Sequence, residues 1–213
     1  MRLALPAPML PATDPAAFDA AVRALAGGAV VAFPTESVYG LGVDARSPAA
    51  IERLVAVRGR EATKPILVLV RDLAMAATVA ASVPPAARRL AARFWPGALT
   101  LVLPARAGVP AAITAGTGTV GVRQSTHPIA AALVDGLGGP VTAPSANPPG
   151  AAPAHTAAEA RAYFGGAIAC YLDGGRCDGP PSTVAVVGDH GMRVLRAGPV
   201  SEAALRAAME GDD

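Results

Sequence analysis

Small polar and basic side chains lie at the ends of several predicted strands, and their types suit the binding of an anionic ligand. These residues are Thr35, Ser37, Arg123, Ser145, Asn147, Ser182 and Arg196. In open α/β sheets, ligands bind beyond the strand ends, where loops supply backbone amides and short hydroxyl side chains. Each hydroxyl alone is typical of a turn or a helix cap. Hydroxyls and arginines together favour a pocket for a phosphate or a carboxylate.

A basic loop, "VRGREATK", gives a second signal. Its residues Arg58, Arg60 and Lys64 stand between a predicted helix and a predicted buried strand. Arginine contacts a phosphate through two nitrogens and lysine supplies a point charge, so the loop could clamp a polyphosphate. A solvated basic turn is an equally good interpretation of this segment alone.

Two glycines belong to the stretch "FPTESVYGLGVDA", which begins with the end of a predicted strand. Gly40 and Gly42 are expected to adopt a positive φ or to let the backbone approach a ligand. The small hydroxyls before them, Thr35 and Ser37, would then face the same ligand.

Other motifs are absent or stand in the wrong context. "GTGTVG" fits the dinucleotide-binding pattern GxGxxG, but it runs into a strand where that motif needs a helix. The chain has no GxxxxGK[ST] and no GxSxG, and its three histidines show no metal-ligand spacing. We therefore expect a site that positions and neutralises its substrates, with no covalent nucleophile and no metal ligands from the protein.

Alternating helices and strands predict an α/β fold with a twisted, mixed sheet flanked by helices. Helices are expected after the capping residues Asp14, Ser47 and Thr156, and at 84–94, at 127–137 and after Ser201. Strands are expected at 29–33, 64–70, 99–104, 119–123, 141–143, 168–173, 182–187 and 193–198. Residues 1–13 are expected to form an irregular N-terminal arm, and residues 14–210 a single domain.

Composition agrees with a folded domain in the cytoplasm. Hydrophobic residues make up 52% of the chain and charged residues 16%, which suffices for a core and argues against disorder. The net charge of +2 is compatible with anionic ligands or RNA but far from a polybasic nucleic-acid binder. The two cysteines suit a reducing compartment, and the apolar runs are too short to span a membrane.

Seven segments in order resemble the motifs of the YrdC family of threonylcarbamoyl-adenylate synthases, in its short, single-domain form. They are "FPTESVYGLGVDA", "RGREATKPILVLV", "FWPGALTLVLP", "VGVRQSTHP", "APSANPPG", "PSTVAVV" and "VLRAGPV". The resemblance implies a concave basic cleft on the sheet. It also implies synthesis of threonylcarbamoyl-AMP and pyrophosphate from L-threonine, bicarbonate and ATP, with Mg²⁺ accompanying ATP. The product would feed threonylcarbamoyladenosine modification of tRNA.

The resemblance also implies roles for single residues. On the ATP side it places Arg58, Arg60, Lys64, Thr119, Ser145, Asn147 and Arg196. On the threonine side it places Thr35, Ser37, Arg123 and Ser182, with Arg123 pairing the substrate carboxylate. The chain departs from the family pattern at Glu61, Leu69 and Pro153, and the first two affect the expected threonine pocket.

Two alternatives stay open at this point. One is an RNA-binding module without enzymatic activity, which the low aromatic content of 4% disfavours. The other is a carbamoyl-transferring relative, which carries the same domain within a longer enzyme. Expected partners are the three substrates and the downstream tRNA threonylcarbamoyl-transferase machinery, with tRNA itself a further candidate and no membrane.

Overall fold

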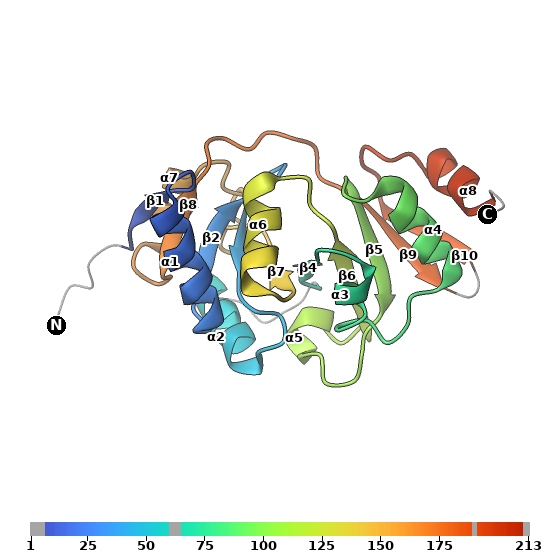
Figure 1. Ribbon diagram of the computed structural model, residues 1–213, viewed down its shortest axis with the longest axis horizontal. Coiled ribbons are helices and arrows are strands. Elements are labelled where there is room, and N and C mark those ends of the chain that lie inside the picture. Colours follow the sequence, from blue (N-terminus) through green and yellow to red (C-terminus); the bar gives the residue numbers. More distant parts are fainter. Residues whose placement is uncertain (1–6, 60–64, 189–190, 211–213) are drawn as a thin grey trace.

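The computed structural model describes residues 7–59, 65–188 and 191–210 (Figure 1). The strands are β1 (Met9–Pro11), β2 (Val31–Pro34), β3 (Tyr39–Gly42), β4 (Leu67–Leu69), β5 (Leu99–Pro104), β6 (Thr119–Arg123), β7 (Val141–Thr142), β8 (Cys170–Asp173), β9 (Thr183–Gly188) and β10 (Gly191–Arg196). The helices are α1 (Pro15–Ala26), α2 (Pro48–Arg58), α3 (Leu73–Ala76), α4 (Pro85–Phe94), α5 (Ala111–Thr114), α6 (Pro128–Leu137), α7 (Ala157–Phe164) and α8 (Glu202–Glu210). The predicted α/β class with flanking helices is confirmed.

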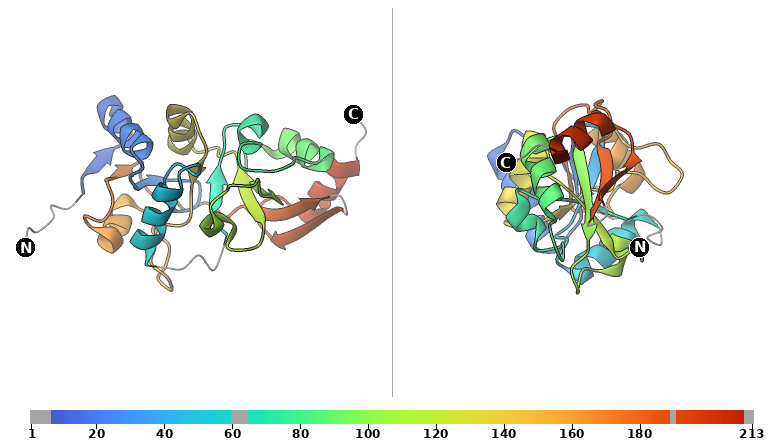
Figure 2. Two further views of the ribbon diagram at one scale, coloured as in Figure 1. Left: turned by 90° about the horizontal axis from the view of Figure 1, so that it is seen from below. Right: turned by 90° about the vertical axis from the view of Figure 1, so that its right-hand side faces the viewer.

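The strands form two sheets, where the sequence predicts one. The first has the order β1-β8-β2-β3 and the second the order β10-β9-β5-β6-β4-β7. Both are mixed: β2 pairs antiparallel with β3 and parallel with β8, and β5 pairs antiparallel with β6 and parallel with β9. Figure 2 shows the sheets inside an elongated molecule, with α1, α6, α3 and α4 along one side.

The two sheets meet where β3 lies beside β7. Isolated bridges join Gly40 to Ser145 and Asp44 to Val141. Between these bridges the Thr142 hydroxyl accepts a hydrogen bond from the Val43 amide and donates one to the Leu41 carbonyl, both at 3.0 Å. A side chain thus replaces part of the regular ladder, which is why the predicted continuous sheet divides here.

The stretch around Gly40 and Gly42 is a buried hairpin strand. Residues 39–42 are all buried, and β3 pairs with β2 from Pro34–Tyr39 to Val31–Gly42. Neither glycine has a positive φ, so the first alternative is wrong, and the close approach of the backbone to a ligand stays a prediction. A Cβ on Gly42 would lie 2.9 Å from Cε1 of Phe33 and 3.0 Å from Cγ1 of Val141. Gly42 therefore makes room for close packing of core side chains.

Short polar side chains begin three helices as the sequence predicts. Asp14 Oδ1 accepts from the Ala16 amide at 3.0 Å, which caps α1. Ser47 caps α2 and Thr156 caps α7 through the amides three residues on, at 3.3 and 3.2 Å. These contacts satisfy amides that lack a partner in the first helical turn.

Several elements depart from the predictions. The described part of the expected N-terminal arm contains β1, which pairs parallel with β8. The short helices α3 and α5 are not predicted, and β4 is limited to Leu67–Leu69. No helix within the described ranges is both long and apolar enough to cross a membrane.

A long connection, residues 174–182, carries the chain from β8 in the first sheet to β9 in the second (Figure 1). The Tyr39 hydroxyl donates to the Gly175 carbonyl at 2.8 Å and accepts from the Gly174 amide at 3.2 Å. The Gly179 amide donates to the Glu36 carbonyl at 2.9 Å. The connection is therefore fixed to the β2–β3 hairpin before it reaches the second sheet.

Candidate active site

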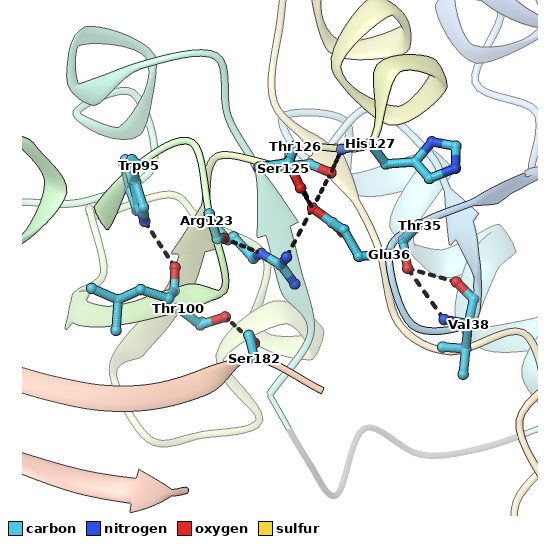
Figure 3. A network of polar contacts seen from close by, with 12 residues as sticks. Thr35, Glu36, Val38, Trp95, Thr100, Arg123, Ser125, Thr126, His127 and Ser182 are labelled. Atoms are coloured by element: carbon cyan, nitrogen blue, oxygen red, sulfur yellow. Dashed lines mark hydrogen bonds and ion pairs between the residues drawn. The ribbon is translucent and has the colours of Figure 1, made fainter. Parts of the chain in front are cut away.

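A buried ion pair joins the two sheets near the centre of the molecule. Glu36 stands in the turn after β2, and Arg123 is the last residue of β6. Glu36 Oε1 lies 2.8 Å from Nη2 of Arg123, and the two side chains are 20% and 6% exposed. The pair therefore places opposite charges side by side where little water reaches them (Figure 3).

The same carboxylate oxygen receives three hydrogen bonds from the loop after β6. The donors are the Ser125 hydroxyl at 2.9 Å, the Thr126 amide at 2.7 Å and the Thr126 hydroxyl at 2.9 Å. Burial acts to raise the pKa of Glu36, but the charge of Arg123 and these hydrogen bonds outweigh it. The pKa of Glu36 consequently lies below its ordinary value, and the group is ionised at neutral pH.

The Phe94–Gly97 segment orients the Arg123 guanidinium. Nε of Arg123 donates to the Gly97 carbonyl at 2.8 Å. Gly97 has no room for a Cβ, which would collide with the Phe94 carbonyl. The Trp95 indole donates to the Leu99 carbonyl at 2.8 Å, which holds this segment against the start of β5. Nη1 of Arg123 makes no hydrogen bond within the described parts of the chain and points away from Glu36 (Figure 3).

Ser182 and Arg196 lie together beside this pair. Arg196 donates from Nε and Nη2 to the Ser182 carbonyl at 3.0 and 2.9 Å, and from Nη2 to the Ser182 hydroxyl at 3.1 Å. The Ser182 hydroxyl also shares a hydrogen bond of 2.8 Å with Thr100. Burial lowers the pKa of Arg123, and the nearby charge of Arg196 lowers it further against the effect of Glu36. Arg196 therefore adds a positive charge in the neighbourhood of the Arg123–Glu36 pair.

The turn that carries Glu36 also holds two of the predicted threonine contacts. The Thr35 hydroxyl donates to the Val38 carbonyl at 2.6 Å, so it shapes the turn. Ser37 is half-buried, and its hydroxyl makes no hydrogen bond to the described residues. Of these two hydroxyls, Ser37 is the one left available to a ligand.

Ser145 and Asn147 lie beside the same hairpin. Ser145 bridges to Gly40, and the Ala146 amide donates to the Tyr39 carbonyl at 2.8 Å. Asn147 Nδ2 donates to the Pro148 and Ala151 carbonyls at 3.0 and 2.9 Å. Its Oδ1 is buried and accepts no hydrogen bond from the described residues.

The remaining predicted ATP contacts stand apart from the ion pair. Thr119 begins β6 and Arg123 ends it, so the four residue steps between them span about 13 Å at the usual rise per residue. Arg58 is the last residue of α2 and is half-buried. Arg60 and Lys64, and the departure at Glu61, lie outside the described residues.

Sequence reasoning missed the residues that organise this site, namely Glu36, Ser125 and Thr126. The signal for Glu36 was an acid placed between two hydroxyls at a strand end. His127, one of the three histidines without metal-ligand spacing, stands next to Thr126. Its Nδ1 is buried without a partner among the described residues, and burial lowers its pKa against the opposing effect of Glu36.

A separate open hollow lies between the starts of α1 and α6. Its lining includes Phe18, Asp19, Pro128 and Ile129 and contains none of the predicted site residues. Its apolar walls do not suit anionic substrates, so we assign the candidate site to the region around Arg123.

The chain matches the sequence model of the Sua5/YciO/YrdC domain, described as "Telomere recombination", over residues 23–198. It belongs to the Sua5/YciO/YrdC family. The family predicted from the sequence is thereby confirmed. Within this family, the threonylcarbamoyl-AMP synthase of Bacillus subtilis is 39% identical over 84% of this chain and 53% of that protein. The enzyme of the same name from Halorhodospira halophila is 38% identical over 77% of this chain and 86% of its own.

A solved Sua5/YciO/YrdC structure has the same fold. Pyrococcus abyssi Sua5 complexed with L-threonine superposes with a TM-score of 0.86 and 36% sequence identity, covering 92% of this chain and 58% of that one. The chain thus spans little more than half the length of the Bacillus and Pyrococcus proteins that it matches.

Proposed function

We propose that this protein is an L-threonylcarbamoyladenylate synthase. It would make threonylcarbamoyl-AMP and pyrophosphate from L-threonine, bicarbonate and ATP. The observation that carries the proposal is the match to a Sua5 structure solved with L-threonine, together with relatives named threonylcarbamoyl-AMP synthase. The product would supply threonylcarbamoyladenosine modification of tRNA in the cytoplasm, through a downstream transferase.

In this proposal the threonine site lies around the β2–β3 turn. Arg123 would receive the substrate carboxylate through Nη1, which is left over from its contacts with Gly97 and Glu36. Ser37 would contact the substrate, and Thr35 and Ser182 would shape the pocket, because their hydroxyls already have protein partners. Arg196 would add positive charge where the anionic substrates gather.

The nucleotide would lie on the side of Ser145, Asn147 and Thr119. Asn147 would shape this side of the site, because its Nδ2 holds the Pro148 and Ala151 carbonyls. Arg58, Arg60 and Lys64 would neutralise the phosphates. The separation of about 13 Å along β6 suits an elongated product with the amino acid at one end and the nucleotide at the other.

The chemistry needs positioning more than a reactive side chain. The threonine ammonium loses a proton, and the free amine attacks the bicarbonate carbon to form a carbamate with loss of water. The carbamate oxygen then attacks the α-phosphorus of ATP and displaces pyrophosphate. Holding three substrates in line supplies much of the rate in such reactions, and fixed positive charge stabilises the charge that develops. Mg²⁺ would enter with ATP, because phosphate oxygens are the ligands it prefers. Within the described ranges no three His, Cys, Asp or Glu side chains gather as a metal-binding group.

The proposal is tested by pyrophosphate release with purified protein. We expect release only when L-threonine, bicarbonate and ATP are all present, and a loss of signal when any one is omitted. Release that is independent of threonine would point to a different adenylating activity. No release under any of these conditions would refute the proposed function.

A further inference from the structure

The Glu36 carboxylate uses its two oxygens very unequally. Oε1 takes the ion pair with Arg123 and all three hydrogen bonds from Ser125 and Thr126. Oε2 accepts no hydrogen bond from any other described residue, although the amide of Glu36 itself also helps to lower the pKa of this carboxyl. An ionised carboxylate has acceptor sites on both oxygens, so four contacts on one leave acceptor capacity on the other unused.

The Glu36 side chain is also more exposed to solvent than the Arg123 side chain. The Glu36 side chain is 20% exposed and that of Arg123 6%. An incoming group with N–H donors therefore has a route to the carboxylate. Among the described residues, Glu36 has no buried side-chain oxygen without a partner, so water can reach Oε2 and the N–H donor of a ligand can replace that water.

The arrangement matches the charges of a free amino acid. A zwitterion carries its ammonium and its carboxylate on the same carbon, so its receptor must offer an acceptor and a donor next to each other. Glu36 and Arg123 bring an acidic and a basic side chain together, with 2.8 Å between Oε1 of Glu36 and Nη2 of Arg123. Nη1 of Arg123 and Oε2 of Glu36 both remain without a partner from any other residue within the described ranges.

We propose that Glu36 Oε2 accepts a hydrogen bond from the α-ammonium group of the amino acid substrate, while Arg123 takes its carboxylate. This inference rests on the proposed function and adds a recognition element to it. The site then selects α-amino acids with both charges free over analogues that lack the ammonium. Glu36 acts as a binding and positioning residue that orients the amine.

Binding measurements with two ligands test this assignment. The ligands are L-threonine and its α-hydroxy analogue, in which a hydroxyl replaces the ammonium. Both are titrated by calorimetry into the wild-type protein and into Glu36→Gln, which keeps an Oε1 acceptor for Ser125 and Thr126 but loses the negative charge. Glu202→Gln is the matched control, because this exposed glutamate pairs only with Arg206 on α8 in the described structure.

The wild-type protein should bind L-threonine at least about tenfold more tightly than the hydroxy analogue, the scale of one charge-assisted hydrogen bond. Glu36→Gln should weaken the binding of L-threonine roughly 10- to 100-fold. It should change the affinity for the hydroxy analogue by less than about threefold. Glu202→Gln should change neither. A structural role for Glu36 would instead weaken both ligands alike, which would overturn the inference.

If Glu36→Gln does not fold, the wild-type comparison decides alone. Equal wild-type affinity for the two ligands means that no group recognises the ammonium, and the inference fails. Failure of the proposed function looks different: the wild-type protein would then neither bind L-threonine nor release pyrophosphate. Normal pyrophosphate release with unchanged threonine affinity in Glu36→Gln would refute the inference and leave the proposed function intact.

Discussion

The ion pair between Arg123 and Glu36 should contribute measurably to stability, because it joins the two sheets where little water reaches it. Arg123→Met removes the counter-ion but keeps most of the side-chain volume. Glu36 would keep three hydrogen bonds at Oε1 while losing the compensating charge. Removing one partner of a fully buried pair costs about 3–5 kcal/mol. Because Glu36 is 20% exposed, we expect about 2–3 kcal/mol.

A double-mutant cycle isolates the interaction. Glu36→Gln alone should cost about 1–2 kcal/mol. The double variant should be more stable than the sum of the single changes predicts, by about 1–2 kcal/mol, because neither charge is then left unpaired. Urea unfolding followed by fluorescence suits this test. The chain has one tryptophan, Trp95, and it stands two residues from the Gly97 carbonyl that holds Arg123.

A second ion pair provides the matched control. Arg206 and Glu202 pair on α8 with 59% and 51% of their side chains exposed. Their coupling in the same kind of cycle should stay below about 0.5 kcal/mol, since water screens exposed pairs. If the Arg123–Glu36 cycle is additive within about 0.5 kcal/mol, the pair does not join the sheets energetically and this reasoning is refuted.

Three further predictions follow from the packing, the charges and the proposed substrate. Gly42→Ala should destabilise the fold by about 1–3 kcal/mol, because the added Cβ would press on Phe33. Gly188→Ala is the control and should change stability little, because a Cβ there would have no atom within 4 Å. Equal unfolding midpoints for the two variants would contradict this explanation of the packing at Gly42. The pKa of Glu36 in the folded protein lies below the unfolded value of about 4.3, so its carboxylate adds stability above that pH, and this stability is lost as the pH falls toward the folded pKa. Below about pH 4, the free energy of unfolding should therefore depend less on pH in Glu36→Gln than in the wild-type protein. Curves of unfolding free energy against pH that run parallel in the two proteins would argue against the shift. In competition assays the wild-type protein should turn over threonine much faster than valine, with serine intermediate. Ser37→Ala should reduce the difference between the threonine and valine rates. Equal turnover of valine and threonine by the wild-type protein would exclude recognition of the substrate hydroxyl.

Local signals in the sequence predict much of the fold. Asp14, Ser47 and Thr156 mark helix starts because each cap depends on amides two or three residues away. The strands at Leu99–Pro104 and Thr119–Arg123 agree with the structure to the residue. Their apolar runs are bounded by proline, glycine or charge, which are local features as well.

Features that depend on distant residues could not be predicted. The close packing at Gly42 involves Val141, and the break between the sheets depends on the Thr142 hydroxyl reaching Leu41 and Val43. Nothing in the local sequence identifies these neighbours, about a hundred positions away. The sequence around Gly42 therefore suggests a positive φ or a close approach to a ligand, where the structure has a packed strand.

The candidate site shows the same division. The sequence identified Arg123 as a ligand contact, because an arginine at a strand end suits an anion. It could not show that Gly97 and Glu36 already use two of its nitrogens, or that one oxygen of Glu36 gathers donors from residues 125 and 126. These contacts form only once the two sheets are brought together.

Mass spectrometry of the reaction product tests the central claim most directly. Purified protein is incubated with L-threonine, ATP, Mg²⁺ and isotope-labelled bicarbonate, and the mixture is analysed for threonylcarbamoyl-AMP. We expect a product that carries the label in its carbamoyl group and that disappears when threonine is omitted. Active, folded protein that consumes ATP without forming this labelled adenylate would contradict it.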